Sequence, residues 1–135
     1  MWICEPSPED WPGLRALARS LGLEYGDMES DRFWIARDGG RVVGLVGLKR
    51  HPDCLELVSL GVEPDRRSQG LGRALVETLF AAAGQDVYLA TVIPEYFQKR
   101  GFRRASAAPA GMAKDPAWCE GCPKERCTIM VRPSP

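Results

Sequence analysis

Apolar positions in this 135-residue chain follow two spacings, one typical of helices and one typical of strands. Leucine and alanine recur every three or four positions within residues 7–22, which predicts an amphipathic helix with a serine cap and a glycine end. The apolar run at residues 71–83 predicts a second helix, again closed by a glycine. Pro94 can open a third helix, over residues 95–100.

Shorter apolar runs bounded by turn residues predict strands. Two of them flank Asp38-Gly39-Gly40, and the next pair flanks His51-Pro52-Asp53, so both turns predict hairpins. Residues 23–31 read as an irregular segment or a short helix, and residues 105–123 as a long loop. The predicted strands cover residues 1–6, 32–37, 41–50, 54–62, 86–91, 102–104 and 127–132.

The segment between the fourth strand and the second helix has the composition of an anion-binding loop. Gly70 and Gly72 would let a ligand approach the backbone, because neither carries a Cβ. A helix start also presents free backbone N–H groups to anions. Arg66, Arg67 and Arg73 add positive charge that suits phosphate.

Three kinds of phosphate loop compete for this segment. The Walker-type loop needs a Gly-Lys-Ser/Thr ending that the chain lacks. The dinucleotide fingerprint needs a third glycine, and Leu75 stands at that position. The third is the pattern Arg67-x-x-Gly70-x-Gly72 after Val62-Glu63-Pro64. A strand–helix turn without a ligand remains the structural alternative.

This third pattern resembles the pyrophosphate loop of the GNAT superfamily of N-acetyltransferases. The segment Tyr96-Phe97-Gln98-Lys99-Arg100-Gly101-Phe102 is similar to a second characteristic segment of the same family, on the helix where the family would have it. The two segments and the order of predicted elements cover nearly the whole chain. The resemblance implies an α+β fold, a mixed and mostly antiparallel sheet with helices on both faces.

The resemblance also implies acetyl-CoA as cosubstrate, held where the strand at residues 54–62 and the strand at residues 86–91 run parallel and splay apart. The pantetheine arm would pair with the end of the first of these strands, the pyrophosphate would rest on the glycine loop, and a lysine of the third helix would approach the phosphates. The cofactor-binding residues so implied are Leu60, Gly61, Val62, Arg67, Gln69, Gly70, Leu71, Gly72, Arg73 and Lys99. For Lys99 a solvated helix face is the alternative.

Glu56 is the candidate catalytic base, because its strand resembles the family strand whose glutamate faces the acceptor. The alternative is an exposed strand carboxylate. An α-amine of pKa about 8 costs about 1.4 kcal/mol to deprotonate at pH 7, whereas a lysine amine of pKa about 10.4 costs about 4.6 kcal/mol. A small amino acid as acceptor therefore demands little of Glu56. A backbone N–H near Leu60 would stabilise the oxyanion.

The usual general acid of the family is absent. Many members place a tyrosine five residues before the Gly-Phe phenylalanine, and here Phe97 occupies that position. Tyr96 is adjacent, but neighbouring helical residues point about 100° apart. This departure resembles short N-acetylglutamate-synthase-like members and relatives linked to arsenical resistance.

Three of the five cysteines lie close together in the sequence and have no assigned role. Cys119, Cys122 and Cys127 have a first pair with zinc-like spacing, yet a tetrahedral site needs a fourth ligand, and Cys4, Cys54 and His51 are the candidates. Redox or substrate chemistry and inert structural thiols are the alternatives to zinc. Zinc binding stays open, and we assign no metal ligand.

Composition excludes several other classes. Positive and negative residues both number 18, so bulk charge does not favour nucleic acid. No apolar run approaches the ~20 residues of a membrane span, and the N-terminus lacks signal-peptide character, so we expect a cytoplasmic protein with no membrane partner. Residues 1–135 are expected to form a single domain; monomer and homodimer stay open.

The predicted function is acetyl transfer from acetyl-CoA to a small-molecule amine, with an amino acid such as glutamate as one acceptor. Two alternatives remain: a protein or peptide N-acetyltransferase, and a non-catalytic sensor that binds CoA or a metal through the cysteine cluster.

Overall fold

The computed structural model describes residues 2–112 and 127–135. Contacts divide the chain into two compact units that interleave along the sequence. The first unit comprises Met1–Lys49 and Leu57–Ala82, and the second comprises Arg50–Glu56 and Ala83–Pro135. A single domain over residues 1–135 stays a prediction.

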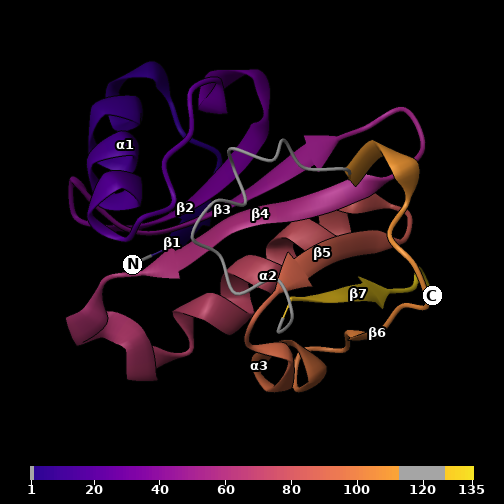
Figure 1. The fold of residues 1–135 in the computed structure, drawn as a ribbon. Coiled ribbons are helices and arrows are strands. Elements are labelled where there is room, and N and C mark those ends of the chain that lie inside the picture. Colours follow the sequence, from indigo (N-terminus) through magenta and orange to yellow (C-terminus); the bar gives the residue numbers. More distant parts are fainter. Residues whose placement is uncertain (1, 113–126) are drawn as a thin grey trace. The chain divides into compact units, whose positions relative to one another are not determined.

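Seven strands and three α-helices are labelled in Figure 1. The strands are β1 (Trp2–Cys4), β2 (Arg32–Asp38), β3 (Arg41–Arg50), β4 (Leu55–Val62), β5 (Val87–Thr91), β6 (Arg103–Arg104) and β7 (Thr128–Arg132). The α-helices are α1 (Trp11–Ser20), α2 (Leu71–Ala83) and α3 (Pro94–Gln98). Four 3₁₀ turns complete the described elements: η1 (Pro8–Asp10), η2 (Met28–Ser30), η3 (Pro64–Gln69) and η4 (Ala110–Met112).

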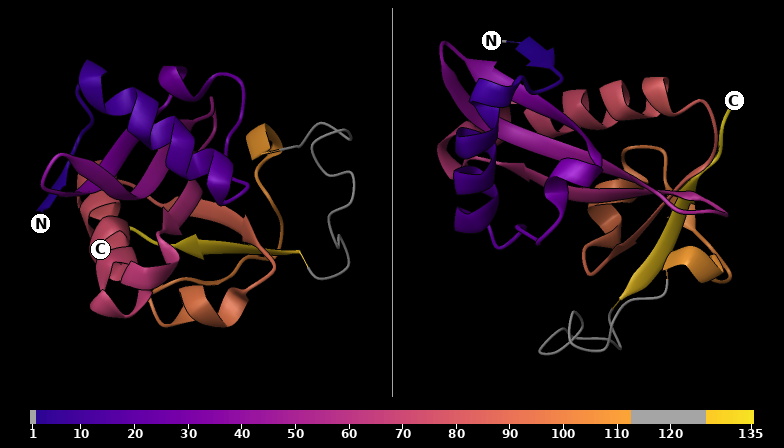
Figure 2. Two further views of the ribbon diagram at one scale, coloured as in Figure 1. Left: turned by 90° about the vertical axis from the view of Figure 1, so that its left-hand side faces the viewer. Right: turned by 90° about the horizontal axis from the view of Figure 1, so that it is seen from above.

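The first unit is a set of neighbouring strands with one helix on each face (Figure 2). The strand order is β1-β2-β3-β4, with β1–β2 and β2–β3 paired antiparallel as the predicted hairpin requires. On the α1 side, Leu14 and Ala18 pack with Phe33 and Ile35, all of them buried. On the other side, α2 buries Leu71, Leu75, Val76 and Leu79, so its apolar stripe supplies the second layer.

The second unit is built around β5, which pairs antiparallel with β7 from Val87 opposite Arg132 to Thr91 opposite Thr128. The short strand β6 pairs with the other edge of β7. The start of β4 pairs with β5 in parallel, with Leu55 opposite Val87 and Glu56 opposite Tyr88. The predicted mixed, mostly antiparallel α+β fold is confirmed.

Element bounds were predicted best where apolar runs end at glycine or at a charged turn. Several elements differ. Strand β1 (Trp2–Cys4) is shorter than the predicted residues 1–6, and the helix predicted after Ser7 begins as η1, with α1 starting only at Trp11. The helix predicted over residues 95–100 ends at Gln98, because its last turn tightens: the N–H of Arg100 donates to the carbonyl of Phe97, and Gly101 adopts a left-handed φ of 90°. The predicted loop at residues 105–123 contains η4, and its residues 113–123 lie outside the described part of the chain.

The helices in the described part of the chain are too short to cross a bilayer. The longest, α2, has 13 residues, against the ~20 that a span requires.

Candidate active site

Strand β4 contains a residue with unusual backbone geometry. Ser59 has a φ of 56°, the one left-handed non-glycine residue among those described. This conformation costs roughly 1–2 kcal/mol for a residue with a Cβ. The Ser59 hydroxyl donates to the carbonyl of Leu23 at 3.0 Å, which helps to hold the distortion in place. Ser59 lies one residue before Leu60, near which the oxyanion-donating backbone N–H is predicted.

The glycine loop leads directly into a helix start. After β4 ends at Val62, η3 runs to Gln69, and Gly70 turns the chain with a left-handed φ of 77°. The first helical bond of α2 joins the N–H of Ala74 to the carbonyl of Gly70 at 3.1 Å. By helix geometry the N–H groups of Leu71, Gly72 and Arg73 therefore belong to the open first turn, at the positive end of the α2 dipole. The loop thus ends at an open helix start, and its binding of an anion stays a prediction.

The loop is anchored to the β2–β3 hairpin by charged pairs. Arg66 bonds to Asp38 at 2.5 Å, and this bond holds the pKa of the Asp38 carboxyl below its ordinary value. Arg41 binds both carboxylate oxygens of Glu63, at 2.7 and 2.9 Å. The backbone N–H of Glu63 also donates to the carbonyl of Val43 at 2.9 Å. These contacts fix the loop before any ligand arrives, which lowers the ordering cost of binding.

Two of the predicted phosphate-binding arginines are exposed on the loop and helix start. The Nε of Arg67 donates to the carbonyl of Val62 at 3.1 Å, so this side chain also braces the turn between β4 and η3. Arg73 and Gln69 are exposed, whereas Leu71, the first residue of α2, is buried. Lys99 is exposed just after α3 and belongs to the second unit.

Glu56 is buried, with 2% of its surface exposed. The alternative of an exposed strand carboxylate is therefore wrong. A buried carboxylate is unfavourable unless hydrogen bonds compensate it. One such bond joins Glu56 Oε1 to Nε2 of His51 at 2.8 Å. From the sequence, His51 was a candidate only as a zinc ligand, although the hairpin predicted at residues 51–53 already brings residue 56 back toward residue 51.

Phe97 belongs to the core of the second unit. It is 6% exposed and packs edge-on against Phe102, with ring centroids 5.7 Å apart. Tyr96 is half-buried, and the guanidinium of Arg100 lies 3.5 Å from its ring centroid. The adjacent aromatic side chains thus have different environments, as their helical spacing predicts.

The described cysteines do not form a metal site. Cys4 is half-buried in the first unit, Cys54 is buried in the second, and Cys127 is exposed. Among residues 2–112 and 127–135, no three His, Cys, Asp or Glu side chains are grouped so as to hold a metal ion. Cys119 and Cys122 lie outside the described residues, so the cluster itself is not tested.

Cys54 should react slowly with alkylating reagents. Burial, followed by the charge of Asp53, raises the pKa of its thiol from 9.0 to about 11. Because the thiolate is the reactive form, brief iodoacetamide treatment at pH 8 should label Cys54 at least tenfold less than exposed Cys127 in peptide mapping. Equal labelling in the folded protein would contradict this.

The raised pKa of Cys54 also predicts a pH-dependent contribution to the free energy of unfolding. The neutral thiol contributes it fully below pH 9, and it is lost as the pH rises toward 11. Cys54→Ala should remove that loss.

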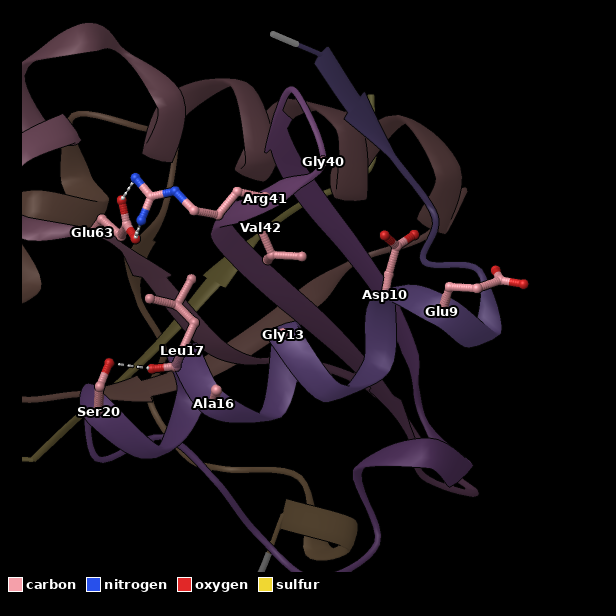
Figure 3. Close-up of a pocket in the computed structure, with 10 residues that line it drawn as sticks. All are labelled: Glu9, Asp10, Gly13, Ala16, Leu17, Ser20, Gly40, Arg41, Val42 and Glu63. Carbon is pink, nitrogen blue, oxygen red and sulfur yellow. Dashed lines mark hydrogen bonds and ion pairs between the residues drawn. The ribbon is translucent and has the colours of Figure 1, made fainter.

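A cavity of about 420 Å³ lies in the first unit, beside α1 and the β2–β3 turn (Figure 3). Two carboxylates that line it already have partners: Asp10 accepts bonds from Ser7, and Glu63 from Arg41. Neither Glu56 nor any predicted cofactor residue lines it, so we do not assign it to the acceptor. The lining residues are Glu9, Asp10, Gly13, Ala16, Leu17, Ser20, Gly40, Arg41, Val42 and Glu63.

Comparison with known proteins identifies what the chain is similar to. The sequence profile of the acetyltransferase (GNAT) family matches residues 2–102. N-acetyltransferase 8 of Rattus norvegicus is 38% identical over 95 residues, which cover 61% of this chain and 43% of that protein. The chain thus spans less than half the length of this relative.

Solved structures share the fold. The N-acetylglutamate synthase of Neisseria gonorrhoeae, complexed with coenzyme A and N-acetyl-glutamate, superposes with a TM-score of 0.80 at 22% identity over 100% of this chain and 36% of that chain. An aminoglycoside 6'-N-acetyltransferase complexed with coenzyme A gives a TM-score of 0.72 at 21% identity, over 100% of this chain and 98% of that chain. At these identities the likeness concerns the fold.

Proposed function

Because the chain belongs to the acetyltransferase (GNAT) family, we propose that it is an acetyl-CoA-dependent N-acetyltransferase. The observation that carries the proposal is the open helix start at α2, which suits an anion. Gly70 has a left-handed φ, the first turn of α2 is open, and charged pairs anchor the loop to the β2–β3 hairpin. Coenzyme A has a pyrophosphate that such a site would bind through backbone N–H groups.

The donor would be held along β4 and the loop that follows it. The backbone of Leu60, Gly61 and Val62 would pair with the pantetheine arm as an added strand does. The backbone from Gln69 to Arg73 would bind the pyrophosphate, with Arg67 and Arg73 supplying charge at its rim. By the family resemblance, Lys99 would also approach the phosphates.

The acceptor would be a small-molecule amine, and an amino acid such as glutamate fits the chemistry. Glu56 would take a proton from the ammonium form, after which the neutral amine attacks the thioester carbonyl. A backbone N–H near Leu60 would stabilise the oxyanion, and the collapse would release the CoA thiolate. With Phe97 in place of a tyrosine, the leaving thiolate would receive its proton from water or from the new amide nitrogen.

Two neighbours support a small acceptor, because their structures concern N-acetyl-glutamate and aminoglycoside chemistry. A panel of free amino acids, aminoglycosides and short peptides would identify the acceptor in an assay of thiol release from acetyl-CoA. Turnover of peptides alone would favour the protein-acetylating alternative. Location in the cytoplasm, and assembly as a monomer or homodimer, stay predictions.

Acetyl-CoA binding provides the direct test. Isothermal titration should detect binding, and Gly70→Ala should weaken it by about tenfold or more, because a Cβ would stand at the helix start where the phosphate approaches. Gly84→Ala is the matched control: Gly84 follows the other end of α2 with a φ of 71° and no neighbour within 4 Å of an added Cβ, as at Gly70. Both variants should lose about 1 kcal/mol of stability.

Comparing Gly70→Ala with Gly84→Ala distinguishes an effect of backbone strain from the loss of a contact with the ligand. Equal weakening in both variants would show that the Gly70 effect is backbone strain alone. Wild-type protein that gives neither heat nor thermal stabilisation with acetyl-CoA would overturn the proposed function.

A further inference from the structure

The second unit contains a pair of ionisable side chains whose members differ in access to solvent. His51 Nε2 and Glu56 Oε1 are 2.8 Å apart, with 16% of the histidine side chain exposed and 3% of the glutamate side chain exposed. His51 is the only histidine of the chain. A proton on Glu56 therefore has a neighbour that can accept it and that reaches the surface.

We propose that His51 is a positioning residue that relays protons from Glu56 to solvent. The inference rests on the proposed function, in which Glu56 deprotonates the acceptor. Acetyl transfer to an ammonium group releases one net proton per turnover, and a base that is nine-tenths buried cannot pass it directly to bulk water. The relay supplies the path.

The acceptor ammonium gives a proton to the Glu56 carboxylate, leaving a neutral amine and a neutral glutamic acid. In the resting pair, the Nε2–H of neutral His51 donates to the Glu56 carboxylate. Once Glu56 is protonated, exchange with solvent moves the ring hydrogen from Nε2 to Nδ1, and Nε2 then accepts the Glu56 proton and restores the carboxylate. The imidazolium loses its Nδ1 proton to water, which returns the ring to the Nε2–H tautomer. No oxidant, reductant or other reactant is needed.

The hairpin and η4 hold the histidine in place. The backbone N–H of His51 donates to the backbone carbonyl of Cys54 at 2.9 Å, which closes the turn. On the other side, a Cβ on Gly111 would lie 2.7 Å from His51 Cβ, so η4 approaches His51 as closely as a glycine permits. Because both contacts are made near the backbone, the ring position depends on the fold of this hairpin and turn.

Among the described residues, Tyr88 of β5 lies opposite Glu56 in the strand register, and the hairpin and η4 contribute the other neighbouring groups. From the hairpin itself, Asp53 accepts a hydrogen bond from the Gly111 N–H at 3.2 Å, and Cys54 is a thiol whose pKa of about 11 keeps it neutral below pH 9. From η4, Gly111 supplies only backbone.

His51→Gln tests the relay, because glutamine can hydrogen-bond to Glu56 but cannot carry a proton. At pH 7 we expect kcat for an α-amine acceptor to fall about tenfold or more, with the Kd of acetyl-CoA unchanged. At pH 9 most of the α-amine arrives neutral, so the defect should nearly vanish. In His51→Ala, added imidazole should restore much of the lost rate at pH 7. Arg50→Gln, an exposed change on the same hairpin, is the matched control and should behave as wild type.

Two outcomes would overturn the relay. One is wild-type kcat in His51→Gln at pH 7. The other is a loss of equal size at pH 7 and pH 9 that imidazole does not relieve in His51→Ala, which would show a purely structural role. If the wild type acetylates an amine in either case, the proposed function stands and only the relay fails. A wild type that transfers no acetyl group would overturn both.

Discussion

Replacing Glu56 with glutamine is expected to lower kcat at pH 7 by about a hundredfold or more. Glutamine keeps the size of the side chain and can hydrogen-bond to His51, but it cannot accept a proton from the acceptor. Since Glu56 is 2% exposed, bulk water cannot simply take over its role at the same position. Steady-state thiol release from acetyl-CoA, with the identified acceptor at saturation, measures the effect.

The pH dependence distinguishes a base from a binding residue. A lost base matters less as pH rises, because an α-amine of pKa about 8 becomes neutral unaided. The ratio of wild-type to Glu56→Gln rates should therefore shrink between pH 7 and pH 9. A lysine-type amine of pKa about 10.4 would keep a large ratio over that range. The size of the shift thus also reports the class of acceptor.

Glu95→Gln is the matched control for this experiment, because Glu95 is exposed on the short helix α3. It should leave kcat unchanged. The Kd of acetyl-CoA and the melting temperature of Glu56→Gln should stay near wild type, which would exclude loss of fold as the cause. Wild-type turnover in Glu56→Gln at pH 7 would remove Glu56 from the mechanism.

The parts of the fold that the sequence predicted are those set by local pattern. Strand β3 and helix α2 have the predicted bounds because β3 is a nearly continuous apolar run between two arginines, and the apolar positions of α2 recur at helical spacing up to a glycine. The loop between β4 and α2 was predictable for a similar reason, since Gly70 must adopt a φ that other residues rarely reach.

The unpredicted parts depend on contacts distant in sequence. The left-handed Ser59 is supported by the carbonyl of Leu23, 36 positions earlier, and serine itself gives no sign of that geometry. The turn η4 meets Asp53 through the N–H of Gly111, 58 positions away. The bond between His51 and Glu56 is local, yet it needs the hairpin register before it can be seen. The candidate donor loop could thus be predicted more completely than the surroundings of the candidate base.

Gly47→Ala is expected to have a large effect on stability. An added Cβ at Gly47 would lie 2.7 Å from two ring carbons of Phe33 and 2.9 Å from Cγ2 of Val58. Phe33 is 1% exposed and its ring also packs against Trp11 and Tyr25, so it has little room to move. Overpacking of this kind costs about 1–3 kcal/mol. The roughly 0.5–1 kcal/mol that alanine gains over glycine within a strand only partly offsets it.

Gly40→Ala provides the contrast, because an added Cβ there meets no atom within 4 Å and the backbone φ is not left-handed. That variant should match the wild type or be more stable by a few tenths of a kcal/mol, since alanine restricts the unfolded chain. Urea unfolding of the three proteins gives the free energies directly. If Gly47→Ala unfolds at the wild-type midpoint, Phe33 can move aside, and the close packing between β2 and β3 is not what requires glycine at this position.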